Sequence, residues 1–190
     1  MDETLLFLGQ MTRRMRVLGT AVPSGPVVAR AMARAVGEIP ENQVILELGP
    51  GTGSFTRELV RRFPNNRIIA IEFVEAFSKH LTKALPSVTV IHGCASELQS
   101  HLDAFQIRPG DVAAVVSGLP FLSLPKELTA KIMTSIETIL QPGRRFVQIT
   151  FSKRAWKRFE LPGFVRESAR RVWRNVPPAI VMTFMRKAES

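Results

Sequence analysis

The sequence contains no tyrosine, only one cysteine and no long run of apolar residues. A single cysteine excludes a framework of internal disulfides, and without about 18 consecutive apolar residues no segment is expected to span a bilayer. Acidic residues are also scarce, because 16 Asp and Glu stand against 26 Lys and Arg, for a formal net charge of +10. Such a basic chain is typical of proteins that bind a polyanion, either nucleic acid or an anionic membrane.

The rest of the composition indicates one globular domain. With 190 residues and a hydrophobic content of 45%, the chain is long enough to bury a sizeable core. The first apolar run precedes Arg13, Arg14 and Arg16, whereas a secretory signal has its basic residues first. We therefore expect a cytoplasmic protein, free or peripheral to a membrane, in which residues 21–190 form one domain.

The segment 1–20 is predicted to form an amphipathic helix. On a helical wheel its apolar residues fall on one face and its arginines mostly on the other. This pattern is typical of a helix that lies in a lipid interface, although a helix that simply packs on the domain would show it too. The candidate membrane-binding residues are Leu5, Phe7, Leu8, Met11, Arg13, Arg14, Met15, Arg16 and Leu18.

The stretch 44–53, VILELGPGTG, organises the rest of the chain. An apolar run carries Glu47, three glycines follow at alternate positions, and a helix is predicted over 54–62. Strand, tight turn and helix form the first unit of a doubly wound α/β fold. Further strands are predicted over 67–72, 88–92, 111–117, 145–151, 164–173 and 180–186, and helices over 26–36, 74–85 and 124–140.

Five alternating units followed by a hairpin predict a mostly parallel seven-stranded sheet with helices on both faces. The glycine spacing limits which cofactor this fold could hold. A dinucleotide fingerprint would need a glycine at Ser54 or Thr56, and a phosphate loop would need G-K-[ST], which is absent. Pro50 also removes a backbone N–H from the turn. The turn therefore permits close backbone approach and favours a cofactor without phosphate.

Two further strand ends add candidate residues to the same edge of the sheet. Glu72 ends the strand over 67–72, nineteen residues after Gly53, where a carboxylate can accept hydrogen bonds from both hydroxyls of a ribose. The strand over 111–117 runs into the turn Gly118-Leu119-Pro120-Phe121, at the crevice where α/β folds bind ligands. Cys94 follows the strand over 88–92 and is interpreted as a small buried hydrophobe.

Residues 144–174 hold much of the positive charge. Trp156, Phe159 and Trp173 are interleaved with the basic residues, and only Glu160 and Glu167 oppose them. The mixture suits a lipid head-group region or RNA, where aromatic rings stack on bases; a solvated basic face with core aromatics is the third interpretation. The basic residues are Arg144, Arg145, Lys153, Arg154, Lys157, Arg158, Arg166, Arg170, Arg171 and Arg174.

The pattern E-x-G-x-G-x-G resembles the first motif of the class I S-adenosylmethionine-dependent methyltransferases. The pieces TAVPSG, ELGPGTGSFTR, SGLPF and VWRNVPPA, spread over nearly the whole chain, resemble the bacterial phospholipid N-methyltransferases. That family is in turn similar to the rRNA adenine dimethyltransferases. Members often carry Tyr-Gly after the fifth strand, where this chain has Phe151-Ser152.

The resemblance implies a Rossmann-like class I methyltransferase with S-adenosylmethionine as donor and no metal, and it assigns no catalytic residue. It implies stepwise methylation of phosphatidylethanolamine towards phosphatidylcholine by a monomer docked on the inner face of the bacterial membrane. The implied cofactor-binding residues are Glu47, Gly49, Pro50, Gly51, Gly53, Glu72, Phe73, Cys94, Ala95 and Ser117. The implied substrate-binding residues are Gly118, Leu119, Pro120 and Phe121.

Two alternatives compete with the lipid substrate. RNA adenine-N6 methylation usually places Asn or Asp before the L-P-[YF] turn, to accept a hydrogen bond from the adenine amine, but Gly118 stands there. Because an exocyclic adenine amine is a poor nucleophile and a lipid amine needs less polarisation, Gly118 favours the lipid. Nucleic acid is therefore not the expected partner. A non-catalytic RNA-binding protein of the same fold is disfavoured by the intact glycine and Glu72 motifs.

Overall fold

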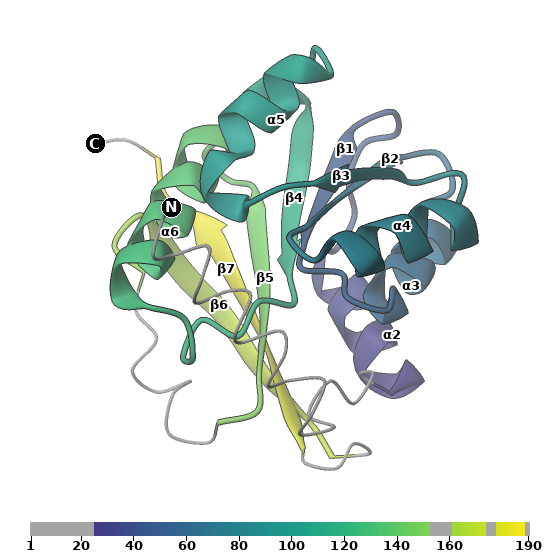
Figure 1. The fold of residues 1–190 in the computed structure, drawn as a ribbon. Helices are drawn as coiled ribbons and strands as arrows, with labels where there is room; N and C mark the ends of the chain where they lie inside the picture. The colour runs from purple at the N-terminus through teal and green to yellow at the C-terminus, as the bar shows by residue number, and fades with distance from the viewer. Residues whose placement is uncertain (1–24, 153–160, 174–177, 189–190) are drawn as a thin grey trace.

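The computed structural model describes residues 25–152, 161–173 and 178–188, which form a seven-stranded sheet in the order β3-β2-β1-β4-β5-β7-β6 (Figure 1). β1 to β5 are parallel, whereas β7 lies antiparallel between β5 and β6. The parallel, carboxyl-terminal ends of β1, β2, β3 and β4 therefore meet at one edge. The strands are β1 (Val44–Leu48), β2 (Arg67–Glu72), β3 (Thr89–His92), β4 (Val112–Ser117), β5 (Arg145–Thr150), β6 (Phe164–Val172) and β7 (Ala179–Arg186).

Helices cover both faces of the sheet, with α2, α3 and α4 on one side and α5 and α6 on the other (Figure 1). Two short 3₁₀ helices, η1 (Ala95–Glu97) and η2 (Pro109–Asp111), lead into α5 and β4. The two-sided cover explains why β1 and β4 are buried along their whole length. The helices are α2 (Pro26–Ala35), α3 (Ser54–Arg62), α4 (Glu75–Ala84), α5 (Leu98–Ala104) and α6 (Lys126–Ile139).

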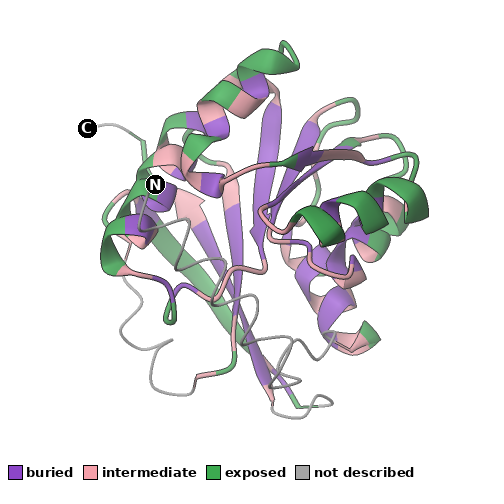
Figure 2. Cartoon of the chain, in the orientation of Figure 1, coloured by how far each residue is buried: buried purple, intermediate pink, exposed green. Residues whose placement is uncertain are grey.

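The core consists of two apolar clusters, one on each face of the sheet, and Figure 2 shows the central strands buried between helices with exposed outer faces. Phe146 of β5 is fully buried and packs against three other phenylalanine rings on the α6 side. Aromatic burial of this size contributes strongly to stability. The α2 side is filled mainly by aliphatic residues such as Val28, Met32 and Ile45.

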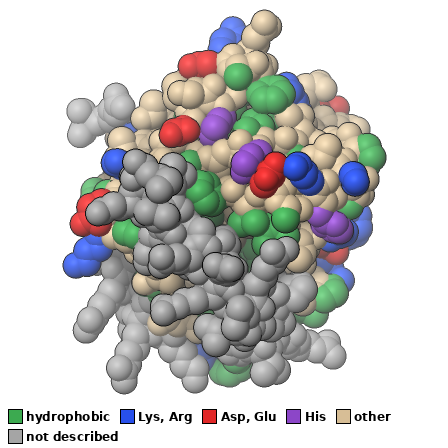
Figure 3. Space-filling view, in the orientation of Figure 1, with side chains coloured by type: hydrophobic (Ala, Val, Ile, Leu, Met, Phe, Trp, Pro, Cys, Tyr) green, Lys and Arg blue, Asp and Glu red, His purple; other side chains and the backbone are tan. Residues whose placement is uncertain are grey.

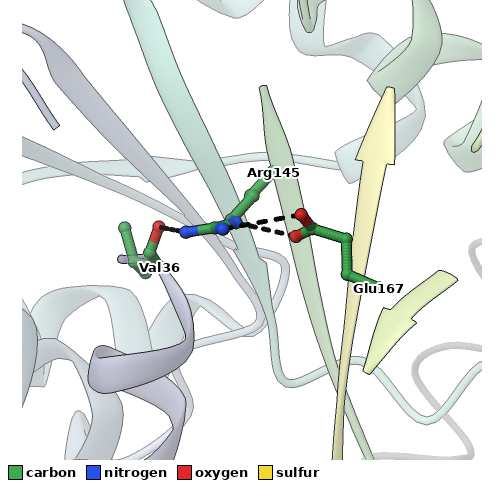
Figure 4. Close-up of polar contacts among 3 residues, drawn as sticks. All are labelled: Val36, Arg145 and Glu167. Atoms are coloured by element: carbon green, nitrogen blue, oxygen red, sulfur yellow. Dashed lines mark hydrogen bonds and ion pairs between the residues drawn. The ribbon is translucent and has the colours of Figure 1, made fainter. Parts of the chain in front are cut away.

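Arg145, the first residue of β5, links the end of α2 to the edge strand β6 (Figure 4). Its Nε donates to a carboxylate oxygen of Glu167 on β6 at 2.7 Å, and its Nη1 donates to the carbonyl of Val36, which caps α2, at 3.3 Å. A cation at a helix C-terminus opposes the partial negative charge there. The contact joins residues 109 positions apart in sequence.

The predicted seven-stranded sheet is confirmed, and the predicted strands and helices end within a few residues of the observed ones. α5 was not predicted, because this short segment has only Leu98 and Leu102 as buried anchors. The amphipathic helix expected over 1–20 lies outside the described residues. Within the described ranges, no helix is both long and apolar enough to cross a membrane.

Figure 3 shows basic and acidic side chains interspersed on one side of the molecule.

Candidate functional site

The glycine turn after β1 lies at the carboxyl-terminal edge of the sheet and leaves one side of its backbone open. Gly49, Gly51 and Gly53 have φ values of 66°, 57° and 82°, a region that glycine adopts without strain. A Cβ built on Gly49 or Gly53 would meet a leucine side chain at 2.7 or 2.5 Å, whereas one on Gly51 would meet nothing within 4 Å. The turn is therefore packed on both flanks and open at Gly51, as a cradle for a cofactor requires.

Glu72, at the end of β2, holds this turn in place. Its two carboxylate oxygens accept hydrogen bonds from the backbone N–H groups of Gly51, at 2.9 Å, and Val74, at 2.8 Å. Burial raises the pKa of Glu72, and the hydrogen bonds from Val74, Gly51 and Phe73 oppose that rise. A carboxylate beside the open side of Gly51 is well placed to accept hydrogen bonds from the hydroxyls of a ribose.

Glu47 is a fully buried carboxyl two residues before the turn. Neither of its oxygens, nor the hydroxyl of Thr56 on α3, has a hydrogen-bond partner among the described residues. Burial raises the pKa of Glu47 to about 8. The nearby Thr56 opposes this rise, and the negative charge of Glu72 adds to it. Unpartnered buried polar atoms are costly, so this group is a candidate for interaction with a ligand.

The end of β3 borders the same crevice. Cys94 is half-buried and its Sγ accepts a hydrogen bond from the hydroxyl of Ser96 at 3.0 Å. A ring N–H of His101 donates to the carbonyl of Cys94, and one of His92 donates to the carbonyl of Phe73, both at 3.0 Å. Sequence reasoning did not identify these two histidines. Their hydrogen bonds hold the backbone just after the ends of β2 and β3.

The turn after β4 approaches the glycine turn so closely that it has no room for a side chain. The N–H of Gly118 donates to the carbonyl of Leu48 at 2.8 Å. A Cβ on Gly118 would lie 2.7 Å from the carbonyl oxygen of Gly49, a backbone atom that cannot simply rotate away. The structure therefore brings the predicted cofactor residues and the predicted substrate turn together. Ser117, fully buried, accepts a hydrogen bond from the N–H of Leu119 at 3.2 Å.

A largely apolar pocket of about 320 Å³ opens beside this turn and extends across β5 to β7. Leu122 and Phe151, both strongly exposed for apolar residues, stand at its walls. The pocket is large enough for the head group or a chain segment of a small amphiphile. It is lined by Gly118, Leu119, Pro120, Phe121, Leu122, Ser123, Gln148, Ile149, Thr150, Phe151, Ser152 and Met182.

Gln148 is a pocket residue that the sequence analysis missed. It is only 2% exposed, and its Nε2 donates to the carbonyls of Leu119, at 2.9 Å, and Ile149, at 2.6 Å. The carbonyl of Leu119 also accepts from the N–H of Phe121, so both its lone pairs are used. A single polar residue inside a strand covered on both faces was the available signal.

Glu58, a carboxylate on α3 near the glycine turn, forms an ion pair with Arg61 of the same helix at 2.8 Å. Among the described residues, no group of three or more His, Cys, Asp or Glu side chains could hold a metal ion. The described part of the site thus offers an open glycine cradle, a ribose-type acceptor and an apolar pocket. This set fits a transfer reaction between two bound molecules.

The fold and the site together define a class I methyltransferase whose cofactor is S-adenosylmethionine. Residues 45–143 match the family model described as "Methyltransferase domain", and the chain belongs to that family. The structure of 1,6-didemethyltoxoflavin-N1-methyltransferase from Burkholderia thailandensis has a TM-score of 0.72 at 15% identity, over 98% of this chain and 89% of that one. At this level of identity, the likeness shows that the two proteins share a fold and nothing more.

Among curated proteins, the chain is similar to the ornithine lipid N-methyltransferase of Singulisphaera acidiphila. The two are 32% identical over an alignment of 185 residues, and this alignment covers 94% of each chain. The rRNA adenine N-6-methyltransferase of Aeromicrobium erythreum is 30% identical over 135 residues, 70% of this chain and 38% of that protein. The first of these relatives, which covers 94% of this chain, is named for a lipid substrate.

Proposed function

We propose that this protein transfers methyl groups from S-adenosylmethionine to the head-group amine of a membrane lipid. Phosphatidylethanolamine and its partly methylated forms, on the way to phosphatidylcholine, are the first proposed substrates. An ornithine lipid is the second, because the relative similar over 94% of the chain is named for it. The observation that carries the proposal is the apolar pocket that opens beside Gly118, where a lipid amine could face the cofactor crevice.

The residues around the crevice divide the work of holding the donor. Glu72 would accept from the ribose, and the open side of Gly51 would let the donor approach the backbone. Phe73, Cys94 and Ala95 would border the adenine. When bound, S-adenosylmethionine supplies a methyl group on a positively charged sulfur. The protein then needs mainly to place an amine lone pair in line with that methyl, and positioning of this kind supplies much of the acceleration.

The acceptor amine must first lose a proton, because an alkylammonium has no lone pair. The pocket around Phe121 is mostly apolar, and desolvation of an amine lowers its pKa. The carbonyl of Leu119 already accepts two hydrogen bonds, so the neighbouring carbonyl of Gly118 is the proposed group that orients the amine. The buried ring of Phe121 could offer its face to the developing cationic charge.

The rival substrate is adenine in RNA, which the second curated relative supports over a shorter span. Adenine N6 needs an acceptor side chain at the position of Gly118. The 2.7 Å approach to the carbonyl of Gly49 leaves no space for one without a shift of the backbone. The lipid amine therefore remains the better candidate.

Membrane association through residues 1–20 is part of the proposal, although those residues lie outside the described ranges. Arg13→Glu with Arg14→Glu reverses two charges, and each basic residue near an anionic surface contributes about 1 kcal/mol. We expect the double variant to lose co-sedimentation with anionic vesicles while its affinity for S-adenosylhomocysteine is unchanged. Equal co-sedimentation of the variant and the wild type would contradict a role for this segment.

The deciding experiment measures methyl transfer from labelled S-adenosylmethionine to three acceptors offered separately. These are vesicles with phosphatidylethanolamine, vesicles with an ornithine lipid, and unmodified small-subunit rRNA. Label in either lipid supports the proposal and tells the two lipids apart. Label in rRNA alone would overturn it.

A further inference from the structure

β6 carries an arginine on the face of the sheet that bears the apolar pocket, and the strand register shows which one. β6 carries three arginines, Arg166, Arg170 and Arg171. Residues that pair across antiparallel strands point to the same face of the sheet. The pairing of β6 with β7, and of β7 with β5, therefore shows which arginine shares a face with the pocket.

Arg171 pairs with Ile180 on β7, and Ile180 pairs with Thr150 on β5. Thr150 lines the pocket, and Ile180 belongs to the core cluster on the α6 side, together with the pocket residue Met182. Arg171, Ile180 and Thr150 therefore form one row across the sheet, on the side where the parallel strands end. With strands about 4.8 Å apart, Arg171 lies two strands from Thr150 and on the strand next to β7, which contributes Met182 to the pocket, so a long side chain can reach towards the pocket.

The other two arginines are directed elsewhere. Arg170 pairs with Val181, which pairs with Ile149, and both of these belong to the cluster on the α2 side. Arg166 pairs with Phe184, in the row of Phe146, near the opposite end of β5. The irregularity in register between Arg166 and Ser168 separates the two parts of the strand.

The surroundings of Arg171 suit an anion at a lipid interface. Its guanidinium stacks on the ring of Trp173, 4.7 Å from the centroid, and Trp173 is 67% exposed. No carboxylate in the described parts of the chain forms an ion pair with Arg171. A stacked guanidinium keeps its donors aligned for a carboxylate or phosphate, and tryptophan favours the boundary between water and lipid. Leu122 and Phe151, at the walls of the pocket, are also exposed apolar residues.

We propose that Arg171, held by Trp173, binds the anionic group of the zwitterionic lipid head group whose amine enters the pocket beside Gly118. The proposal rests on the proposed function, and it deepens it by assigning a specificity-determining residue. The anion is a phosphate in phosphatidylethanolamine and a carboxylate in a lipid whose ornithine is acylated on its α-amine. The shared chemistry is an amine at one end of the pocket and an anion at the other.

The test compares Arg171→Gln with Arg170→Gln in the full-length protein. The two variants remove the same charge from adjacent positions of one strand, and only the first faces the pocket. Methyl transfer is measured in mixed micelles of a non-ionic detergent, so that surface charge does not concentrate the enzyme. The mole fraction of phosphatidylethanolamine, or of ornithine lipid in the second arm, is varied to obtain KM and kcat separately.

For Arg171→Gln we expect KM for the lipid to rise about tenfold or more, as for loss of a charge-assisted hydrogen bond. We expect kcat, the affinity for S-adenosylhomocysteine and the melting temperature to stay near those of the wild type. Arg171→Lys should fall in between, since lysine keeps the charge without the planar fork. Arg170→Gln should leave KM within about twofold.

A defect confined to one lipid would support the proposal and identify phosphate or carboxylate as the anion. Equal KM values for Arg171→Gln and Arg170→Gln would overturn it and leave the proposed function standing. If the wild type binds S-adenosylhomocysteine but methylates neither lipid, the proposed function and this inference both fail.

Discussion

Glu47 gives the protein a pH-dependent stability that a single substitution should remove. Its pKa is raised from 4.5 to about 8 by complete burial, so the folded chain keeps a proton that the unfolded chain releases above about pH 4.5. The folded state therefore binds more protons throughout this window, and its stability must fall as the pH rises from about 4.5 to about 8. In Glu47→Gln this contribution is absent at every pH.

The size of the effect follows from the linkage relation. Each pH unit inside the window costs the folded wild type about 1.4 kcal/mol, so it loses about 3 kcal/mol relative to Glu47→Gln between about pH 5.5 and about pH 7.5. For a chain of 190 residues, that corresponds to a change of about 6 to 12 °C in the difference between the two melting temperatures.

The assay is thermal unfolding of both proteins without cofactor, followed by circular dichroism at several pH values. Comparison at each pH cancels the titration of all other groups. Glu38→Gln, which alters an exposed carboxyl just after α2, is the matched control and should track the wild type. A difference between wild type and Glu47→Gln that stays constant from about pH 5.5 to about pH 7.5 would refute the reasoning. It would mean that Glu47 is already ionised in the folded state.

Three other substitutions test the site and its support. Gly118→Ala places a Cβ 2.7 Å from a backbone carbonyl, so we expect a loss of about 1–3 kcal/mol in stability and weaker donor binding, measured by denaturant unfolding and calorimetry. Glu72→Gln removes the charge that accepts from the turn and should raise the Kd for S-adenosylmethionine about tenfold or more, measured by calorimetry. Arg145→Ala breaks a partly exposed ion pair with Glu167 and a helix-end contact, so the melting temperature should fall by about 2–4 °C while the rate of methyl transfer in vitro is unchanged.

The parts of the fold that local sequence determines were predictable. Alternating glycines from Gly49 to Gly53 can follow a buried strand only as a tight turn, and Gly25 before Pro26 marks a helix start that the structure confirms. The run of Val, Ala and Ser over 112–117 similarly predicts a strand buried on both faces. These features depend on neighbours within a few positions, which the sequence displays directly.

The parts that depend on contacts across the sheet were not predictable. Gln148 appears in sequence as one polar residue in a strand, and only the fold shows that its amide fixes the carbonyl of Leu119. The raised pKa of Glu47 requires its complete burial, which is a property of the folded chain. The face occupied by Arg171 depends on the register irregularity after Arg166. Periodicity alone assigns Arg166 and Arg170 to the same face, because it cannot detect the extra residue.

Gly118 links the geometry of the donor site to the choice of acceptor. Its N–H bonds to the carbonyl of Leu48, and its missing side chain lets the turn touch the carbonyl of Gly49. A side-chain acceptor at this position would push apart the two turns that enclose the cofactor crevice. Under the proposed function, this geometry favours amines that need no such acceptor, and an alkylamine needs only deprotonation in an apolar pocket. In the proposed enzyme, selectivity then comes from groups beyond this turn, and the register places Arg171 on the face of the sheet that carries the pocket residue Thr150.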